Sequence, residues 1–100
     1  MNIIQTQLPG LLLIQPKIFG DARGYFFESY REDRYQEMGI ACSFVQDNAS
    51  RSEQGVLRGL HFQTQHAKDK LVTVTRGELF DVAVDIRRNS PTFGQSYGTI

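Results

Sequence analysis

The sequence has 100 residues, 40% of them hydrophobic and 11% aromatic, which is enough for one domain with an apolar core. Eleven basic and eleven acidic side chains cancel, so the chain has no general attraction for nucleic acid. It has one cysteine, Cys42, no basic leader and no apolar run near the length of a membrane span. We therefore expect a cytoplasmic protein without a nucleic-acid or membrane partner.

The predicted elements are mostly strands. Apolar, aromatic or β-branched segments bounded by turn residues are typical of strands, and they occur over residues 11–14, 24–30, 44–50, 56–62, 70–76 and 79–86, with the start of another at 95–100. A turn is expected at residues 20–24, which read GDARG. One short helix is expected near residues 31–38, because Ser29 and Glu32 have capping-box spacing and Gly39 is a typical helix stop. Short strands at regular spacing favour a barrel of the jelly-roll kind, and we expect that barrel to be incomplete.

The aromatic segment at residues 24–30 has a carboxylate on one of its faces. In a strand, Phe26 and Glu28 share one face, while Tyr25 and Phe27 share the other. A charged side chain beside a large aromatic ring fits either a solvated face at a sheet edge or a polar site. The segment is therefore a candidate for binding a ligand.

A second polar face is predicted for residues 44–50, which read FVQDNAS. Alternation places Gln46 and Asn48 on the same face of this strand. Their amides can read the edges of a base or the hydroxyls of a sugar, or they can lie on a solvated sheet face.

The stretch Gly55–Gln63, GVLRGLHFQ, places Arg58 and His61 inside an apolar run. Because charged side chains are rarely buried unpaired, this strand can line a polar cavity. In the alternative, Arg58 reaches the surface and His61 is a hydrogen-bonded core residue. Strict alternation puts the two on opposite faces, with Gly59 between them. We therefore predict a bulge or bend near Gly59–Leu60 if both line one cavity.

Several chemistries lack the residues that they need. A jelly-roll metal site requires a His-x-His pair and further ligands, whereas His61 is followed by Phe62 and Gln63, and the only other histidine is His66. No serine or cysteine has a base at an evident spacing, and there is no glycine-rich dinucleotide or phosphate loop. The sequence therefore gives no sign of a metal or a cofactor.

Proton abstraction by a histidine is the chemistry that the residues favour. Histidine titrates near neutrality, so His61 can act as a base next to a carbonyl. Arg58 and Lys70 are cations that can stabilise an enolate or bind a phosphate. Such a base needs an orienting carboxylate, for which Asp81 and Asp85 are candidates if their shared face is the inner one.

Four segments together resemble a known family. FGDARGYFFESY, FVQDNAS, GVLRGLHFQ and KLVTVTRGELFDVAVDIRRNSPTFG, in this order, resemble the amino-terminal half of dTDP-4-dehydrorhamnose 3,5-epimerases. The resemblance implies a mainly β, cupin-like jelly-roll fold and an isomerase of dTDP-L-rhamnose synthesis that needs no metal or cofactor. Such an enzyme inverts the two carbons flanking the C4 ketone of dTDP-4-dehydro-6-deoxy-glucose through enolates. Two alternatives stay open: a mono-epimerase of another dTDP-sugar, and a non-catalytic domain that binds a nucleotide sugar.

The resemblance also implies roles for individual residues. His61 matches the general base, Lys70 the lysine near the ketone, and Arg58 a contact to the nucleotide phosphates. The remaining substrate-binding positions that it implies are Arg23, Glu28, Gln46 and Asn48.

Finally, the resemblance implies that residues 1–100 are the amino-terminal part of a single cupin-like domain. The family's tyrosine acid, a second site histidine and the aspartate that orients the base would follow residue 100, which weakens the case for Asp81 or Asp85. The implied assembly is a homodimer that exchanges amino-terminal strands, with the region from Arg23 to Glu28 able to contribute to the partner's site.

Overall fold

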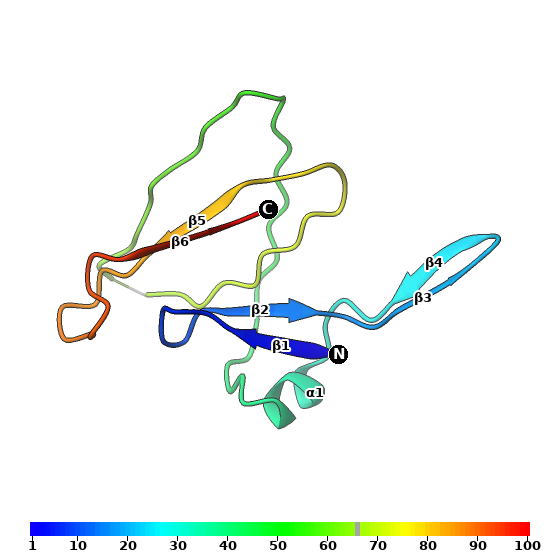
Figure 1. The fold of residues 1–100 in the computed structure, drawn as a ribbon, viewed down its shortest axis with the longest axis horizontal. Helices are drawn as coiled ribbons and strands as arrows, with labels where there is room; N and C mark the ends of the chain where they lie inside the picture. Colours follow the sequence, from blue (N-terminus) through cyan, green and yellow to red (C-terminus); the bar gives the residue numbers. More distant parts are fainter. Residues whose placement is uncertain (66) are drawn as a thin grey trace. The chain divides into compact units, whose positions relative to one another are not determined.

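A computed structural model describes residues 1–65 and 67–100, and its secondary structure is mainly β with one short helix (Figure 1). The elements are β1 (Asn2–Gln5), β2 (Leu12–Gln15), β3 (Ile18–Asp21), β4 (Gly24–Phe27), α1 (Glu32–Glu37), β5 (Asp81–Val84) and β6 (Ser96–Thr99). The strands form three separate antiparallel pairs, β1–β2, β3–β4 and β5–β6. The chain divides into two compact units: Met1–Arg31 with Thr73–Ile100, and Glu32–Val72. No helix in the described part of the chain is long and apolar enough to cross a membrane.

The β1–β2 hairpin in the first unit is closed by a side-chain hydroxyl. In its register, Asn2 pairs with Gln15 and Gln5 pairs with Leu12, next to the turn. The Thr6 hydroxyl donates to the Leu11 carbonyl at 2.8 Å and accepts from the Leu8 backbone N–H at 3.2 Å. Because this hydroxyl satisfies backbone groups inside the turn, the Leu8 side chain can be buried, with 3% of its surface exposed.

The β3–β4 hairpin carries the aromatic segment. Asp21 pairs with Gly24, so the connection has two residues, and Gly24 has a φ of +135° that a residue with a Cβ rarely adopts. The turn predicted at residues 20–24 is therefore confirmed. The Tyr25 and Phe27 rings stack with centroids 6.0 Å apart, which confirms that they share one face. β4 ends at Phe27, earlier than the predicted strand end at residue 30.

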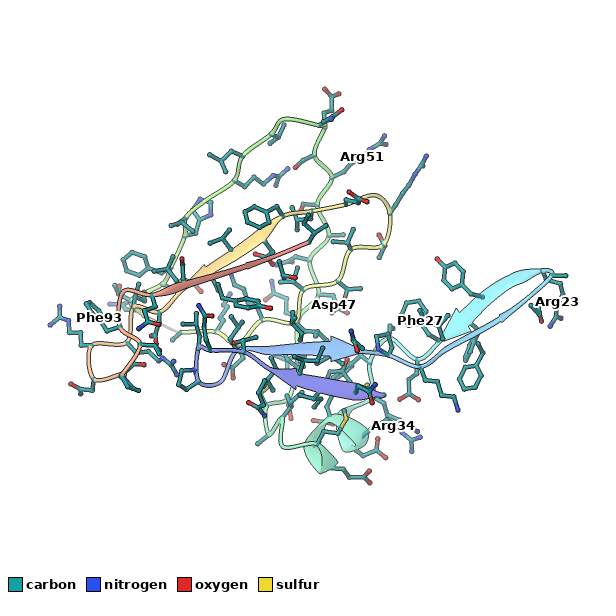
Figure 2. The ribbon with its side chains drawn as sticks, viewed as in Figure 1. Arg23, Phe27, Arg34, Asp47, Arg51 and Phe93 are labelled. Atoms are coloured by element: carbon teal, nitrogen blue, oxygen red, sulfur yellow. The ribbon has the colours of Figure 1, made fainter. Side chains whose placement is uncertain are left out.

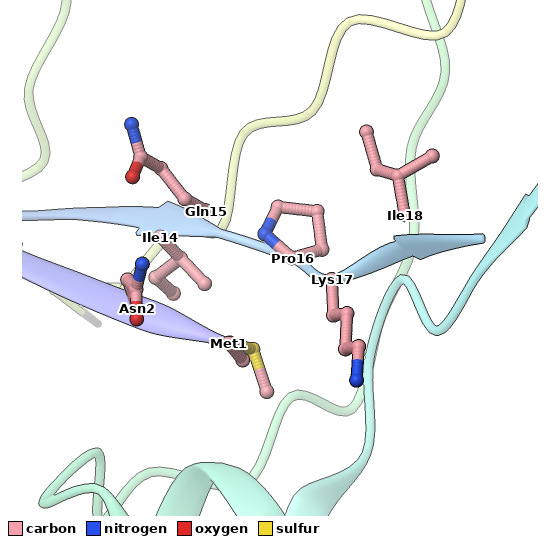
Figure 3. Close-up of a pocket in the computed structure, with 7 residues that line it drawn as sticks. All are labelled: Met1, Asn2, Ile14, Gln15, Pro16, Lys17 and Ile18. Carbon is pink, nitrogen blue, oxygen red and sulfur yellow. The ribbon is translucent and has the colours of Figure 1, made fainter. Parts of the chain in front are cut away.

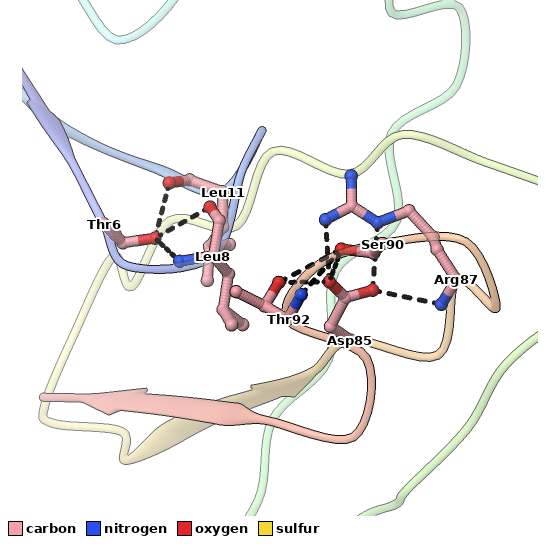
Figure 4. Close-up of polar contacts among 7 residues, drawn as sticks. All are labelled: Thr6, Leu8, Leu11, Asp85, Arg87, Ser90 and Thr92. Carbon is pink, nitrogen blue, oxygen red and sulfur yellow. Dashed lines mark hydrogen bonds and ion pairs between the residues drawn. The ribbon is translucent and has the colours of Figure 1, made fainter.

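The β5–β6 hairpin depends on a buried carboxylate. Asp85, only 5% exposed, follows β5 and accepts hydrogen bonds from the backbone and side chain of Arg87 and from the hydroxyls of Ser90 and Thr92 (Figure 4). The two hydroxyl contacts measure 2.6 Å each. These bonds hold the pKa of the Asp85 carboxyl well below its usual range, with the Arg87 side chain as the largest cause. The Asp85 carboxylate thus binds three residues of the loop 85–95, which is also held by backbone hydrogen bonds such as that from Gly94 N–H to the Asp85 carbonyl.

Two contacts join the β5–β6 hairpin and its loop to the first hairpin of the same unit. The Gln7 side-chain amide donates to the Ser96 carbonyl at 3.0 Å, although the two residues are 89 positions apart. A Cβ added at Gly10 would lie 3.7 Å from Nη1 of Arg87, so the first turn also lies against the guanidinium that binds Asp85.

The second unit contains α1, which confirms the helix predicted near residues 31–38. Tyr35 is its buried residue, 3% exposed, and its carbonyl accepts from the Ile40 backbone N–H at 2.9 Å. Gly39 has a φ of +92° and ends the helix as predicted. The helix begins at Glu32, whose carboxylate accepts a hydrogen bond from the Ser43 hydroxyl. Ser29, the expected N-cap, therefore lies three residues before the first residue of the observed helix.

The strands predicted over residues 44–50, 56–62 and 70–76 are wrong, since these segments form no regular strand. Their sequences suit a pleated, half-buried surface, but a strand also needs a neighbour that accepts and donates along its backbone. Within the described residues these segments pair with no such neighbour. Most of their apolar side chains are accordingly exposed, as Val45 and Leu57 show at 92% and 90%, whereas Phe44 and Leu71 are half-buried. The strands expected at 79–86 and 95–100 do form, as β5 and β6.

We predict that Asp85→Asn loosens the loop 85–95. The amide cannot accept at both side-chain atoms, so two or more of the bonds from Arg87, Ser90 and Thr92 are lost. Amide hydrogen exchange at Gly94, whose N–H donates to the Asp85 carbonyl, should accelerate about tenfold. Because the pKa of Asp85 is lowered by folding, protection should be full above about pH 4 and should decline as the pH falls below it.

Asp81→Asn is the matched control, because Asp81 begins the same strand and is exposed. It should leave exchange at Gly94 unchanged. Equal acceleration by the two substitutions would show that the loop does not depend on the Asp85 carboxylate.

Candidate functional site

Arg23 lies at the tip of the β3–β4 hairpin, where Figure 2 shows it at the end of the two strands. Its Nη2 is 2.6 Å from Oδ2 of Asp21, and its backbone N–H donates to Oδ1 of Asp21 at 2.8 Å. The ion pair lowers the pKa of the Asp21 carboxyl and raises that of the Arg23 guanidinium. The Arg23 side chain is 90% exposed, so its orientation comes from Asp21 and not from packing. Glu28, directly after β4, is half-buried.

Gln46 and Asn48 share one side of the chain, as predicted. The Gln46 side-chain nitrogen donates to Oδ1 of Asn48 at 3.3 Å. Both residues are exposed. Their segment is extended but unpaired, so the amides form a small polar surface whose remaining donors and acceptors can meet a ligand.

Arg58 is held by the loop that precedes it. Its Nε donates to the Ser52 hydroxyl at 2.9 Å, and its Nη2 donates to the Arg51 carbonyl at 3.1 Å. Arg58 is exposed, which agrees with the alternative in which this side chain reaches the surface. The guanidinium nevertheless has a fixed orientation, because two atoms of one short loop hold it.

The backbone changes direction between Arg58 and His61. Gly59 has a φ of +116°, so the backbone there is not that of a regular strand. The bulge or bend that would turn both side chains into one cavity stays a prediction, because no strand forms over these residues. A Cβ at Gly59 would lie 3.8 Å from the His61 backbone nitrogen and 3.9 Å from its Nδ1. His61 and Lys70 are both exposed, so the alternative of a core histidine is wrong for this structure.

The predicted site residues thus fall into local groups. Arg23 and Glu28 belong to the β3–β4 region of the first unit. The second unit carries Gln46, Asn48, Arg58, His61 and Lys70. Sequence reasoning missed the residues that orient the two arginines, Asp21 and Ser52. The Asp-x-Arg spacing of Asp21 and Arg23 was a usable signal, whereas the contact between Ser52 and Arg58 depends on how their loop turns.

Asp81 and Asp85, the two carboxylates considered for orienting His61, differ in whether they can still accept a hydrogen bond. Both carboxylate oxygens of Asp85 already accept hydrogen bonds from its own loop, so it has no capacity left for an imidazole. Asp81 is exposed on β5. Among the residues that the structure describes, no three His, Cys, Asp or Glu side chains are placed to hold a metal ion, and His66 lies outside those residues.

An open pocket lies elsewhere, at the end of the β1–β2 hairpin (Figure 3). It is lined by Met1, Asn2, Ile14, Gln15, Pro16, Lys17 and Ile18. None of these is a predicted site residue, and Lys17 is the one charged side chain in the lining. The lining contains no carboxylate, histidine or thiol, so this pocket lacks the usual general bases of a catalytic site.

Comparison with known proteins extends these observations. The sequence profile of the dTDP-4-dehydrorhamnose 3,5-epimerase family matches residues 5–100. The dTDP-4-dehydrorhamnose 3,5-epimerases of Pseudomonas aeruginosa and Salmonella typhimurium are 56% and 55% identical to the chain over 99 and 100 residues. Each match covers 98% of this chain and 55% of the relative. The chain thus spans about half the length of the curated relatives that it matches.

Solved structures of epimerases are also similar to this chain. The dTDP-6-deoxy-D-glucose-3,5-epimerase of Legionella pneumophila, in complex with dTDP-4-keto-L-rhamnose, is 61% identical with a TM-score of 0.93, over 98% of this chain and 53% of that one. The dTDP-4-dehydrorhamnose 3,5-epimerase of Bacillus anthracis, with TDP and PPi bound, is 44% identical with a TM-score of 0.92, over 98% and 57%.

The fold is therefore that of the cupin-like sugar-nucleotide epimerases, which confirms the predicted fold class. With the profile match over residues 5–100, the chain belongs to the dTDP-4-dehydrorhamnose 3,5-epimerase family.

We predict that Gly59→Ala is strongly unfavourable, because an alanine must then adopt a φ of +116°. Holding a residue with a Cβ in such a conformation costs about 1 to 3 kcal/mol. The free energy of unfolding, measured by urea titration, should fall by that amount. Gly20→Ala is the control, since the backbone there is not left-handed and a Cβ would make an ordinary 3.7 Å contact. An equal loss at Gly20 would contradict the assignment of the effect to the backbone at Gly59.

Proposed function

We propose that this chain is the amino-terminal part, within a single cupin-like domain, of an epimerase that acts on dTDP-4-dehydro-6-deoxy-glucose. The observation that supports this most directly is the match to the Legionella pneumophila enzyme, whose structure contains dTDP-4-keto-L-rhamnose. That enzyme is 61% identical over 98% of this chain, a match that includes the segments carrying nearly all the candidate residues. The reaction inverts C3 and C5 of the sugar and serves dTDP-L-rhamnose synthesis.

His61 is the proposed general base. The two carbons to be inverted flank the C4 ketone, so the same carbonyl acidifies the proton on each. His61 takes the proton, the electron pair of the C–H bond moves into the C–C bond, and the carbonyl oxygen becomes an enolate. Lys70 stabilises that negative charge. An acid on the opposite face, for which the family resemblance implies a tyrosine after residue 100, then gives a proton to the carbon as the enolate returns to the ketone, and no metal or cofactor takes part.

The remaining candidate residues are proposed to bind the substrate, mainly its nucleotide part. Arg58 binds the diphosphate, since a guanidinium presents paired N–H groups that match phosphate oxygens. Arg23 is a further substrate-binding position, on a hairpin that can contribute to the partner's site. Gln46 and Asn48 supply amide donors and acceptors to the nucleoside, and Glu28 accepts from hydroxyl or N–H groups. The hydrogen bond between Gln46 and Asn48 supports this role, because it keeps both amides on one side of the chain.

We predict that His61→Ala, in the protein expressed from its natural gene, lowers the rate of proton exchange at C3 and C5 at least about 100-fold. The imidazole that accepts the proton is absent, whereas the groups that bind the nucleotide remain. The measurement is deuterium incorporation into the sugar in D2O, followed by proton NMR.

His66→Ala is the matched control, because it removes the other histidine of the chain. It should leave exchange unchanged. Exchange at the wild-type rate in His61→Ala would exclude His61 as the base. Binding of dTDP by the wild-type protein without any exchange would instead favour a non-catalytic nucleotide-sugar binding domain.

We further propose a homodimer in which amino-terminal strands are exchanged between subunits. Phe19 and Phe26 lie opposite each other in the β3–β4 hairpin and are 55% and 71% exposed. A two-stranded hairpin with exposed aromatic residues is marginal in water and is stabilised when another surface covers it. We also propose a cytoplasmic location, a compartment in which a free thiol such as Cys42 stays reduced.

We predict that Phe26→Ser shifts the protein from dimer towards monomer, because the substitution removes apolar area from the proposed interface. Sedimentation velocity at micromolar concentration should resolve the two species. Phe93→Ser, at a side chain that is 56% exposed on the loop 85–95, is the control and should leave the dimer intact. A monomeric wild-type protein would refute the proposed exchange of strands.

A further inference from the structure

The loop 51–58 fixes one edge of the Arg58 guanidinium. Nε donates to the Ser52 hydroxyl at 2.9 Å and Nη2 donates to the Arg51 carbonyl at 3.1 Å. Both acceptors come from adjacent residues, so the plane of the guanidinium is set by a single short segment. An exposed arginine without such contacts samples many rotamers.

The opposite edge of the guanidinium is left for a ligand. An arginine has five N–H donors, and the two contacts above use the edge formed by Nε and Nη2. Both N–H groups of Nη1 and the second N–H of Nη2 donate to no residue that the structure describes. These atoms form the other edge, whose parallel N–H groups match two oxygens of a phosphate.

The chemistry of the acceptors also distinguishes Arg58 from two other arginines. Arg23 and Arg87 donate through the same edge to the carboxylates of Asp21 and Asp85, which offset their charge. Arg58 donates to a neutral hydroxyl and a neutral carbonyl. Its orientation is therefore fixed without loss of the positive charge that attracts an anion.

We propose that Ser52 is a positioning residue, which orients the Arg58 guanidinium so that its outer edge receives the diphosphate of the nucleotide. This inference rests on the proposed function, because it takes the contact between Arg58 and phosphate as given. Ser52 contributes by ordering a long side chain before the ligand arrives, so that less side-chain entropy is lost on binding.

The test is a double-mutant cycle on the protein expressed from its natural gene, with dTDP as the ligand. Dissociation constants are measured by calorimetry, and phosphorus NMR of the nucleotide extends the range to weak complexes. We expect Ser52→Ala to weaken dTDP binding about three- to tenfold in the wild-type background. In the Arg58→Ala background the same change should have no effect, because the side chain that Ser52 orients is absent.

Two further variants separate positioning from a structural role. Ser52→Thr keeps a hydroxyl at the position and should bind dTDP within about twofold of wild type. Ser96→Ala removes a hydroxyl that bonds to no described residue, and it should leave the affinity unchanged. In turnover, Ser52→Ala should raise KM with little change in kcat, since it acts on the bound nucleotide and not on proton transfer.

The outcomes are distinguishable. An equal loss of affinity from Ser52→Ala in both backgrounds would overturn the inference, because the serine would then act on the fold and not through Arg58. Unchanged binding in Ser52→Ala, with weakened binding in Arg58→Ala, would overturn the inference and leave the proposed function standing. A wild-type protein that binds no dTDP would refute the proposed function itself, and the inference with it.

Discussion

The buried carboxylate of Asp85 is the interaction on which the first unit depends. A charge that is removed from water must be paired and hydrogen-bonded, and Asp85 receives its partners from one loop: Arg87, Ser90 and Thr92. The loop therefore has to fold back on the end of β5, which brings the two strands of the β5–β6 hairpin together. The same arrangement leaves the Ser96 carbonyl to accept from Gln7, so that a polar cluster joins segments that are far apart in sequence.

The sequence predicted those elements whose signals are local. The turn at residues 20–24, the helix and its stop at Gly39 all depend on residues within a few positions of each other. The strands expected over residues 44–50 and 56–62 failed because a strand requires a partner, and no pattern within a segment reveals whether that partner is present. The expectation that Asp85 could orient His61 was wrong for a related reason. Alternation predicts the face on which a carboxylate lies, but it does not predict that the following loop turns back and binds that carboxylate.

For the candidate site, the sequence and the family resemblance propose which residues carry chemistry, and the structure adds how some of them are oriented. Three arginines use the same edge of the guanidinium to bind an acceptor two to seven residues away. The acceptor decides what each can do next. Arg87 is committed to a buried carboxylate and is structural. Arg23 is paired with the exposed carboxylate of Asp21, and a phosphate can compete with that carboxylate for the guanidinium. Arg58 has neutral acceptors and keeps its charge.

The segment from Arg58 to His61 places two proposed roles, anion binding and proton abstraction, within four residues. We propose that Arg58 holds the anion and His61 takes the proton, and Gly59, with a φ of +116°, lies between them. In a regular strand these side chains would point to opposite faces, and the positive φ at Gly59 interrupts that regularity. Under the proposed roles, a change at Gly59 is expected to affect phosphate binding and proton abstraction together, whereas a change at Ser52 is expected to act on Arg58, with which its hydroxyl forms a hydrogen bond.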